Sequence, residues 1–158
     1  MTRYERLFGA GPRGIAISLM LFVLAWLLKS AAGLPSIADS AIVRWTIFVL
    51  SIMISGSLAV WSFKSLPATA RGTDLITSGP YKYLRHPLYA CLLSSFNFGL
   101  AMLLNNWIFL IWALVLHPLW HWNIRREEKL MTKTFPNEYA AYCKVTGRFL
   151  PKIFPPKH

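Results

Sequence analysis

One short segment carries the residue types best suited to chemistry. It reads Ser78-Gly79-Pro80-Tyr81-Lys82-Tyr83-Leu84-Arg85-His86-Pro87-Leu88-Tyr89. An apolar run typical of a membrane span follows it directly. Pro87 suits the first position of a helix, because its missing N–H costs nothing there. His86 would then cap that helix, where free backbone N–H groups and the helix dipole attract an anion. We therefore expect a functional site here.

A second polar segment, 123–148, follows the last apolar run. Only Asn105-Asn106 separates the last two apolar runs, so they are expected to form a tight antiparallel hairpin. His86 and Glu127 would then be neighbours, and a cation, an anion, aromatic rings and a helix N-terminus would share one pocket. Such a pocket suits a zwitterionic ligand that carries an amino acid moiety and an adenine.

A simpler interpretation of the glutamates remains open at this point. Glu127 and Glu128 would merely pair with neighbouring basic residues on a solvated helix face. Those neighbours are Arg125, Arg126 and Lys129.

Composition places the chain among membrane proteins. Its 158 residues are 55% hydrophobic and 15% charged, with a mean hydropathy of +0.43, which is too apolar for a soluble domain of this size. A span needs roughly 20 residues, and four runs fit, at about 14–34, 43–63, 87–104 and 107–124. The sequence predicts an all-α membrane protein, 1–158, with a helical tail from residue 125.

Basic residues set the expected orientation. With four spans, 15 of the 17 Lys and Arg residues fall on one side of the membrane and 2 on the other. Because cytoplasmic loops carry the excess of positive charge, both termini are expected in the cytoplasm, at a bacterial inner membrane or an endomembrane. The net charge of +11 is then explained by contact with anionic lipid, and we expect no nucleic-acid partner.

Two histidines and two cysteines raise the question of a metal. His117 and His121 are four residues apart and share a helix face, so they could bind haem or a metal. Four histidines in the whole chain are too few for a di-iron membrane oxidase, and polar packing is the favoured role. Cys91 and Cys143 are expected to be packing residues. We therefore expect no metal site.

The two polar segments contain a pair of motifs. The first is the segment 73–81, TDLITSGPY, followed by Arg85-His86-Pro87-Leu88-Tyr89. The second comprises Glu127-Glu128, Leu130, Phe135, Tyr139, Tyr142 and Arg148-Phe149-Leu150-Pro151. In this order, each beside the expected apolar runs, they resemble the signature of the isoprenylcysteine carboxyl methyltransferase and phospholipid methyltransferase superfamily. The resemblance covers about half the chain.

The resemblance implies an integral membrane enzyme that uses S-adenosylmethionine without the Rossmann-like fold of soluble methyltransferases. His86 would favour the carboxylate of this cofactor, and Glu127 its cationic end or its ribose. The implied cofactor-binding residues are Thr73, Asp74, Leu75, Ile76, Tyr81, His86, Pro87, Leu88, Tyr89 and Glu127.

The resemblance also implies an acceptor side. Arg85, Arg125 or Arg126 would orient an acceptor carboxylate or phosphate, since a guanidinium offers a planar fork of donors. Glu128 would take the proton of an amine acceptor, whereas a carboxylate or thiolate needs no base. Arg85 and Glu128 are thus candidate catalytic residues. Asn123, Arg125 and Arg126 are candidate substrate-binding residues, and Asn123 stands where the isoprenylcysteine enzymes have an arginine for acceptor recognition.

Two functions follow from these observations. The first is a membrane methyltransferase that acts on a lipophilic or membrane-delivered acceptor, with a carboxylate, amine or thiol as nucleophile. The alternative is a non-catalytic accessory or assembly protein on the same scaffold. The extra N-terminal spans of larger family members are not expected here. The acceptor pocket would then be more open to lipid or completed by a second copy in a homo-oligomer.

Overall fold

The computed structural model describes residues 9–66 and 74–152. Four helical segments are long and apolar enough to cross a membrane. They are α2 (Gly11–Ala32), α3 (Ala41–Ser65), a third made of α4 (Pro87–Ala90), η3 (Cys91–Phe96) and α5 (Asn97–Leu104), and a fourth that begins with α6 (Trp107–Asn123) and continues into α7 (Arg125–Thr134). The prediction of an all-α membrane protein is confirmed, since the described residues contain helices and a single isolated bridge.

The hairpin between the third and fourth spans has a clear local cause. Asn105 takes a left-handed conformation, with φ of 53°, which asparagine tolerates better than most residues. The Asn106 side chain then caps α6 by accepting a hydrogen bond from the Ile108 N–H at 3.0 Å, as N-cap residues do. The chain therefore reverses direction within two residues. The start of the third span and the end of α6 then lie at the same end of the molecule.

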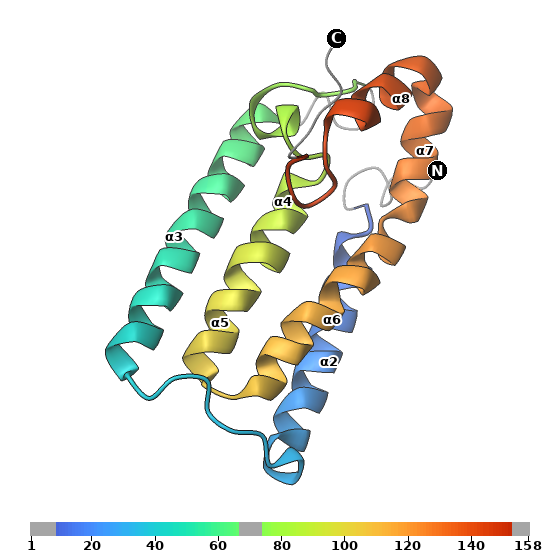
Figure 1. Cartoon of the computed structure of the whole chain (residues 1–158). Helices are drawn as coiled ribbons and strands as arrows, with labels where there is room; N and C mark the ends of the chain where they lie inside the picture. The colour runs from blue at the N-terminus through green and yellow to red at the C-terminus, as the bar shows by residue number, and fades with distance from the viewer. Residues whose placement is uncertain (1–8, 67–73, 153–158) are drawn as a thin grey trace.

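The helices lie side by side in the order α3, α4–α5, α6 and α2 (Figure 1). Small residues let α3 approach the third span closely: a Cβ on Gly99 would lie 2.4 Å from the Ser51 Cβ. Ser95 Oγ also donates to the Ser51 carbonyl at 3.0 Å, and Ser55 Oγ donates to the Cys91 carbonyl at 2.9 Å. Hydrogen bonds between small polar residues are a common means of packing helices in a membrane.

The third span contains a turn that its sequence did not predict. Residues 91–96 form a π-helix, in which the Asn97 N–H donates to the Leu92 carbonyl five residues earlier. Such turns are often found at functional sites. Here the Ser55 hydroxyl binds the carbonyl of Cys91, the first π residue, so contacts with α3 support the wider turn.

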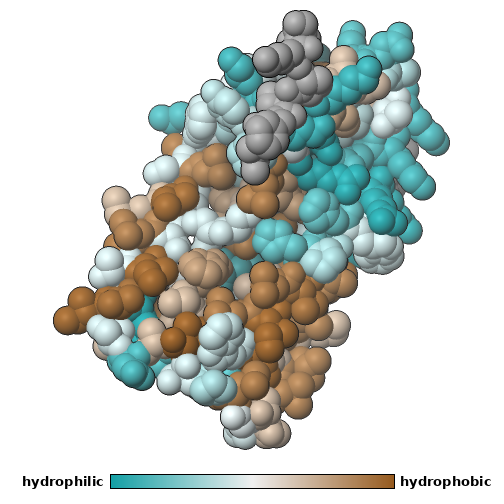
Figure 2. All heavy atoms as spheres, in the orientation of Figure 1, coloured by the Kyte–Doolittle hydropathy of each residue, from teal (hydrophilic) through white to brown (hydrophobic). Residues whose placement is uncertain are grey.

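The surface divides into an apolar and a polar part (Figure 2). Many large apolar side chains on the long helices are exposed, including Leu19, Leu27, Ile42 and Leu114, as expected for helices surrounded by lipid. The hydrophilic part lies mainly over α7 and α8 (Pro136–Val145) (Figures 1 and 2). The short helix η2 (Gly79–Lys82) lies at this same end of the molecule.

Candidate functional site

The first contacts of the candidate site join the start of the third span to the start of α7. His86 is the residue before α4, and Glu127 and Glu128 lie in the first turn of α7. His86 Nδ1 is 3.5 Å from Glu127 Oε2, and His86 Nε2 is 3.6 Å from Glu128 Oε1. The expected proximity of His86 and Glu127 is therefore confirmed.

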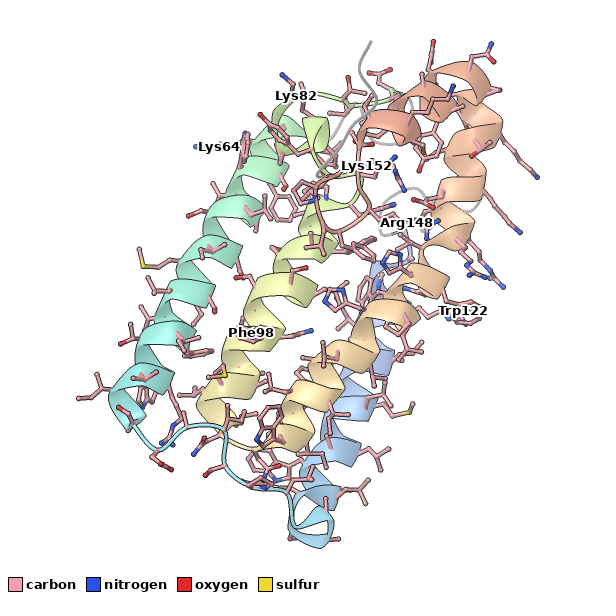
Figure 3. The ribbon with its side chains drawn as sticks, in the orientation of Figure 1. Lys64, Lys82, Phe98, Trp122, Arg148 and Lys152 are labelled. Atoms are coloured by element: carbon pink, nitrogen blue, oxygen red, sulfur yellow. The ribbon has the colours of Figure 1, made fainter. Side chains whose placement is uncertain are left out.

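Glu128 is held by two arginines from separate parts of the chain. Arg85 Nε donates to its Oε1 at 3.0 Å, and Arg148 Nε donates to the same oxygen at 3.1 Å. Arg148 Nη2 lies 2.5 Å from the other oxygen, Oε2, and Figure 3 shows Arg148 at this end of the molecule. Two guanidinium groups stabilise the ionised carboxylate. Glu128 therefore pairs across the tertiary structure, and not with its neighbours on a solvated helix face.

Arg85 is itself fixed by further contacts. Its Nη1 donates to the carbonyl of Thr146 at 2.6 Å and to that of Cys143 at 3.4 Å. Its backbone N–H donates to the Gly147 carbonyl at 2.8 Å. Arg85 thus ties the loop before the third span to the segment after α8, and it does so from a largely buried position.

Glu127 has a different set of partners. The Ala10 N–H and the Tyr89 hydroxyl both donate to its Oε1, the latter at 3.0 Å. Gly9, in the same turn, has φ of +53°, and a Cβ there would lie 1.9 Å from Glu127 Oε1. Only a glycine fits this approach without displacement. The partners of Glu127 are therefore neutral donors, together with the nearby His86.

Two buried polar atoms of this cluster have no hydrogen-bond partner within the described part of the chain. They are His86 Nε2 and Asn123 Oδ1. Asn123 uses its other side-chain atom, Nδ2, to donate to the Ala10 carbonyl at 2.9 Å. His86 Nε2 still faces the Glu128 carboxylate at 3.6 Å, so Asn123 Oδ1 is the atom of this pair that is open to a further partner.

The segment after α8 also contributes side chains to the cluster. The sequence did not predict this contribution. The side chain of Phe149 is buried between two histidines, with ring centroids 6.1 Å from His86 and 4.8 Å from His121. Arg148 Nη1 lies 3.2 Å from His121 Nδ1. Backbone pairing places this segment, because the His86 N–H donates to the Arg148 carbonyl at 3.1 Å.

Several contributing residues were not among the predicted site residues: Ala10, Trp120, His121, Arg148 and Phe149. Arg148 and Phe149 belong to the second motif, and this was the only signal that pointed to them. Trp120 packs on Tyr89 with ring centroids 4.8 Å apart, which positions the hydroxyl that binds Glu127.

Other predicted residues lie outside the cluster. Arg125 and Arg126 are exposed on α7, and among the described residues no salt bridge joins either of them to the glutamates. Asp74 is exposed. Leu75 lines a separate surface hollow of about 450 Å³, together with Thr77, Glu138, Ala141, Tyr142 and Val145. Thr73 lies outside the described residues.

The remaining predicted residues support the loop. Tyr81 is buried, and its carbonyl accepts a hydrogen bond from the Tyr142 hydroxyl at 2.5 Å. Burial raises the pKa of Tyr142 above its usual value, so this hydroxyl keeps its proton and remains a donor. Pro87 is buried at the first position of α4, and Ile76 and Leu88 are half-buried. Within the described residues, no group of three or more His, Cys, Asp or Glu could hold a metal ion.

Comparison with known proteins identifies the family. The sequence pattern of the phospholipid methyltransferases matches residues 36–138, which includes every charged residue of the cluster except Arg148. The chain belongs to the phospholipid methyltransferase family. No solved structure matches it.

The curated relatives are of two kinds, a methyltransferase and two metal-resistance proteins. The chain is 34% identical over 95 residues to the protein-S-isoprenylcysteine O-methyltransferase of Schizosaccharomyces pombe, a match that covers 58% of this chain and 40% of the relative. It is 36% identical over 84 residues to the cobalt-zinc-cadmium resistance protein CzcN of Cupriavidus metallidurans, and 36% identical over 88 residues to the nickel-cobalt-cadmium resistance protein NccN of Alcaligenes xylosoxydans xylosoxydans. Each of these two matches covers 52% of this chain and 38% of the relative. The chain thus spans about two fifths of the length of these relatives.

Proposed function

We propose that this membrane protein transfers a methyl group from S-adenosylmethionine to a lipophilic or membrane-delivered acceptor. One observation carries the proposal. Asn123 Oδ1 is buried without a hydrogen-bond partner among the described residues, and Ala10, which accepts from the same Asn123 side chain, also donates to Glu127; Asn123 and Glu127 both belong to the part of the chain that matches the methyltransferase family.

The residues present fit this cofactor in kind. Glu127 offers a carboxylate whose other partners are mainly neutral donors, so an ammonium group or ribose hydroxyls can replace them. The imidazole of His86 suits the cofactor's carboxylate.

The proposed mechanism depends on positioning. The bound cofactor would supply an activated methyl group on a sulfonium. The chain's own residues would exclude water from the largely buried cluster and hold the acceptor in line, and alignment of this kind provides much of the acceleration in such transfers. Glu127 would orient the cofactor, and Tyr89 would orient Glu127 through its hydroxyl.

We propose positioning roles for Arg85 and Glu128. Glu128 is paired with two guanidinium groups, which makes its carboxylate a poor proton acceptor. The Arg85 guanidinium donates hydrogen bonds to Glu128 and to backbone carbonyls. An acceptor that needs no base, such as a carboxylate or a thiolate, therefore suits this cluster better than an amine does.

Arg125 and Arg126 are proposed to meet the acceptor at the membrane surface. Both are exposed in the first turn of α7, immediately after the apolar part of the fourth span, where an anionic group of a lipophilic molecule would lie. Asn123 is proposed to contribute its free Oδ1 to the same end of the site.

The test is S-adenosylmethionine binding to detergent-purified protein by calorimetry. We expect wild type to bind, and Glu127→Gln and His86→Ala to bind at least about tenfold more weakly. Glu138→Gln is the matched control, because it removes the same charge from an exposed position on α8. Binding by wild type would justify a screen of carboxylate, thiol and amine acceptors in vesicles with a labelled methyl group.

A second candidate is a non-catalytic accessory protein. It is favoured by the names of the two relatives that are metal-resistance proteins. A folded wild-type protein that does not bind S-adenosylmethionine would overturn the enzyme proposal and support this candidate.

A further inference from the structure

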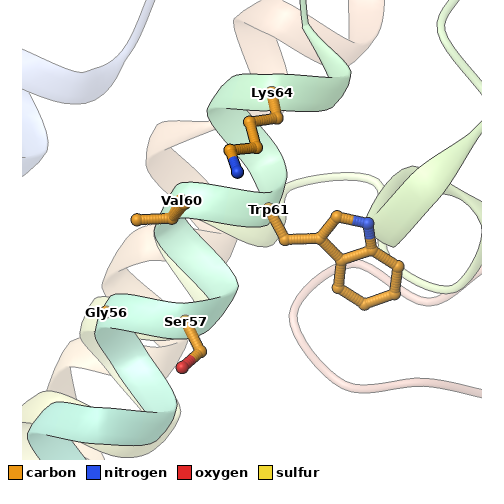
Figure 4. A pocket seen from close by; sticks show the side chains of 5 residues that line it. All are labelled: Gly56, Ser57, Val60, Trp61 and Lys64. Atoms are coloured by element: carbon orange, nitrogen blue, oxygen red, sulfur yellow. The ribbon is translucent and has the colours of Figure 1, made fainter.

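The exposed face of α3 carries a shallow hollow that lies apart from the cluster. It has a volume of about 470 Å³ and is lined by Gly56, Ser57, Val60, Trp61 and Lys64 (Figure 4). These residues recur at intervals that place them on one face of the last turns of the helix. In Figure 1 the third span lies between α3 and α6, so this hollow is apart from the glutamate cluster.

The hollow lies on the exposed side of a helix that is long and apolar enough to span a membrane. All five lining residues are exposed, and the opposite face of α3 buries Ser51, Ser55 and Ser62. A Cβ placed on Gly56 would meet nothing within 4 Å. The floor of the hollow is therefore open, and within the described structure no side chain from another helix lines it.

One end of the hollow carries a positive charge. Lys64 lies in the last turn of α3, where the span ends, and no salt bridge joins it to an acid within the described residues. Figure 4 shows its side chain running back along the helix toward Ser57, the direction that helical side chains favour. Trp61, an aromatic residue typical of membrane interfaces, flanks the same end.

We propose that this hollow binds one anionic glycerophospholipid of the bilayer. The Lys64 ammonium would bind the phosphate and the charged headgroup, and an acyl chain would lie over Gly56 and Ser57 beside Val60. A second copy of the chain is a less suitable occupant, because a helix–helix contact here would bury the Lys64 charge in an apolar environment. The proposal is independent of the methyltransferase proposal.

Native mass spectrometry of the full chain in detergent tests the proposal. The probes are phosphatidylglycerol and phosphatidylcholine with identical acyl chains, titrated onto delipidated protein. We expect wild type to bind phosphatidylglycerol about fivefold more tightly, which is the factor that one lysine near an anionic lipid provides. Lys64→Gln should abolish this preference, whereas Lys133→Gln, an exposed lysine on α7, should preserve it.

A second variant, Gly56→Leu, tests the contribution of the shape of the hollow to lipid binding separately from that of the Lys64 charge. Gly56→Leu should fill the hollow and weaken the binding of both lipids, while circular dichroism shows that the helices are intact. Equal binding of the two lipids by wild type, or an unchanged preference in Lys64→Gln, would overturn the proposal. A wild-type dimer that Gly56→Leu converts to a monomer would also overturn it, by identifying the hollow as a protein interface.

Discussion

Glu127 and Glu128 are adjacent in sequence, but their surroundings differ. Glu128 is bound by Arg85 and Arg148 and is 12% exposed. Glu127 is bound by a backbone N–H and a tyrosine hydroxyl and is 22% exposed. Both lie near His86. The comparison shows that two adjacent glutamates can have different kinds of partner, charged groups in one case and neutral donors in the other.

The difference follows from the strength of the partners. Hydrogen bonds between charged groups are roughly twice as strong as those between neutral groups, so a ligand would not readily replace the arginines of Glu128. The hydrogen-bond donors to Glu127 are neutral, so a ligand can replace them at a lower cost in free energy. A cation or a set of hydroxyls is therefore expected to bind at Glu127, while Glu128 keeps the surrounding elements in place.

The largest expected effect is on stability and comes from Glu128. Glu128→Gln would leave Arg85 and Arg148 without their anion, and breaking a buried charge network in this way costs about 3 kcal/mol. Thermal unfolding in detergent should show a clear drop in midpoint. A variant as stable as wild type would remove the distinction between the two glutamates.

The next effect is on binding and comes from Glu127. Glu127→Gln keeps the shape of the side chain but removes its charge, so we expect S-adenosylmethionine affinity to fall at least about tenfold, or roughly 1.4 kcal/mol. The unfolding midpoint should stay close to that of wild type, because the lost partners are neutral donors. Loss of stability without loss of affinity would reverse the assigned roles.

A substitution at Gly9 tests whether the close contact between its turn and Glu127 contributes to stability. In Gly9→Ala, the left-handed backbone costs roughly 1 kcal/mol, and the new Cβ would meet Glu127 Oε1. We expect a lower unfolding midpoint than that of wild type. Gly33→Ala is a matched control: it also has positive φ, but no atom lies within 4 Å of its Cβ position. Equal losses in both variants would mean that the contact with Glu127 contributes nothing.

Tyr89→Phe gives the smallest effect. It removes one hydroxyl that donates to Glu127 and keeps the ring that packs on Trp120. A single hydrogen bond of this kind contributes about 1 kcal/mol, so we expect a severalfold loss of S-adenosylmethionine affinity. Calorimetry with the variant measures it, and unchanged affinity would show that Tyr89 does not orient Glu127.

Local patterns predicted the spans well. The apolar runs gave four helices close to their observed bounds, and Asn105-Asn106 gave the hairpin. The expected meeting of His86 and Glu127 depended on that hairpin alone, and it is confirmed. Hydropathy and a two-residue turn are local properties, so they can be recognised without knowledge of the packing.

Other features were wrong or missing in the prediction. The place of Phe149 was missing, since the motif that contains it did not indicate that its ring lies near His86 and His121. The π turn at 91–96 has no glycine or proline to mark it. Arg125 and Arg126 seemed natural partners for the glutamates, but both are exposed, and Glu128 pairs instead with Arg85 and Arg148 from other parts of the chain.

The sequence by itself determined that the chain spans a membrane, where its helices run, and that two polar motifs face each other at one end. Only the tertiary structure decided which glutamate receives which partner. The donor to Glu127 comes from Ala10, which is 117 positions away, and one arginine of Glu128 comes from the segment after α8. Contacts between such distant residues depend on how whole helices pack together, and local sequence patterns do not predict that packing.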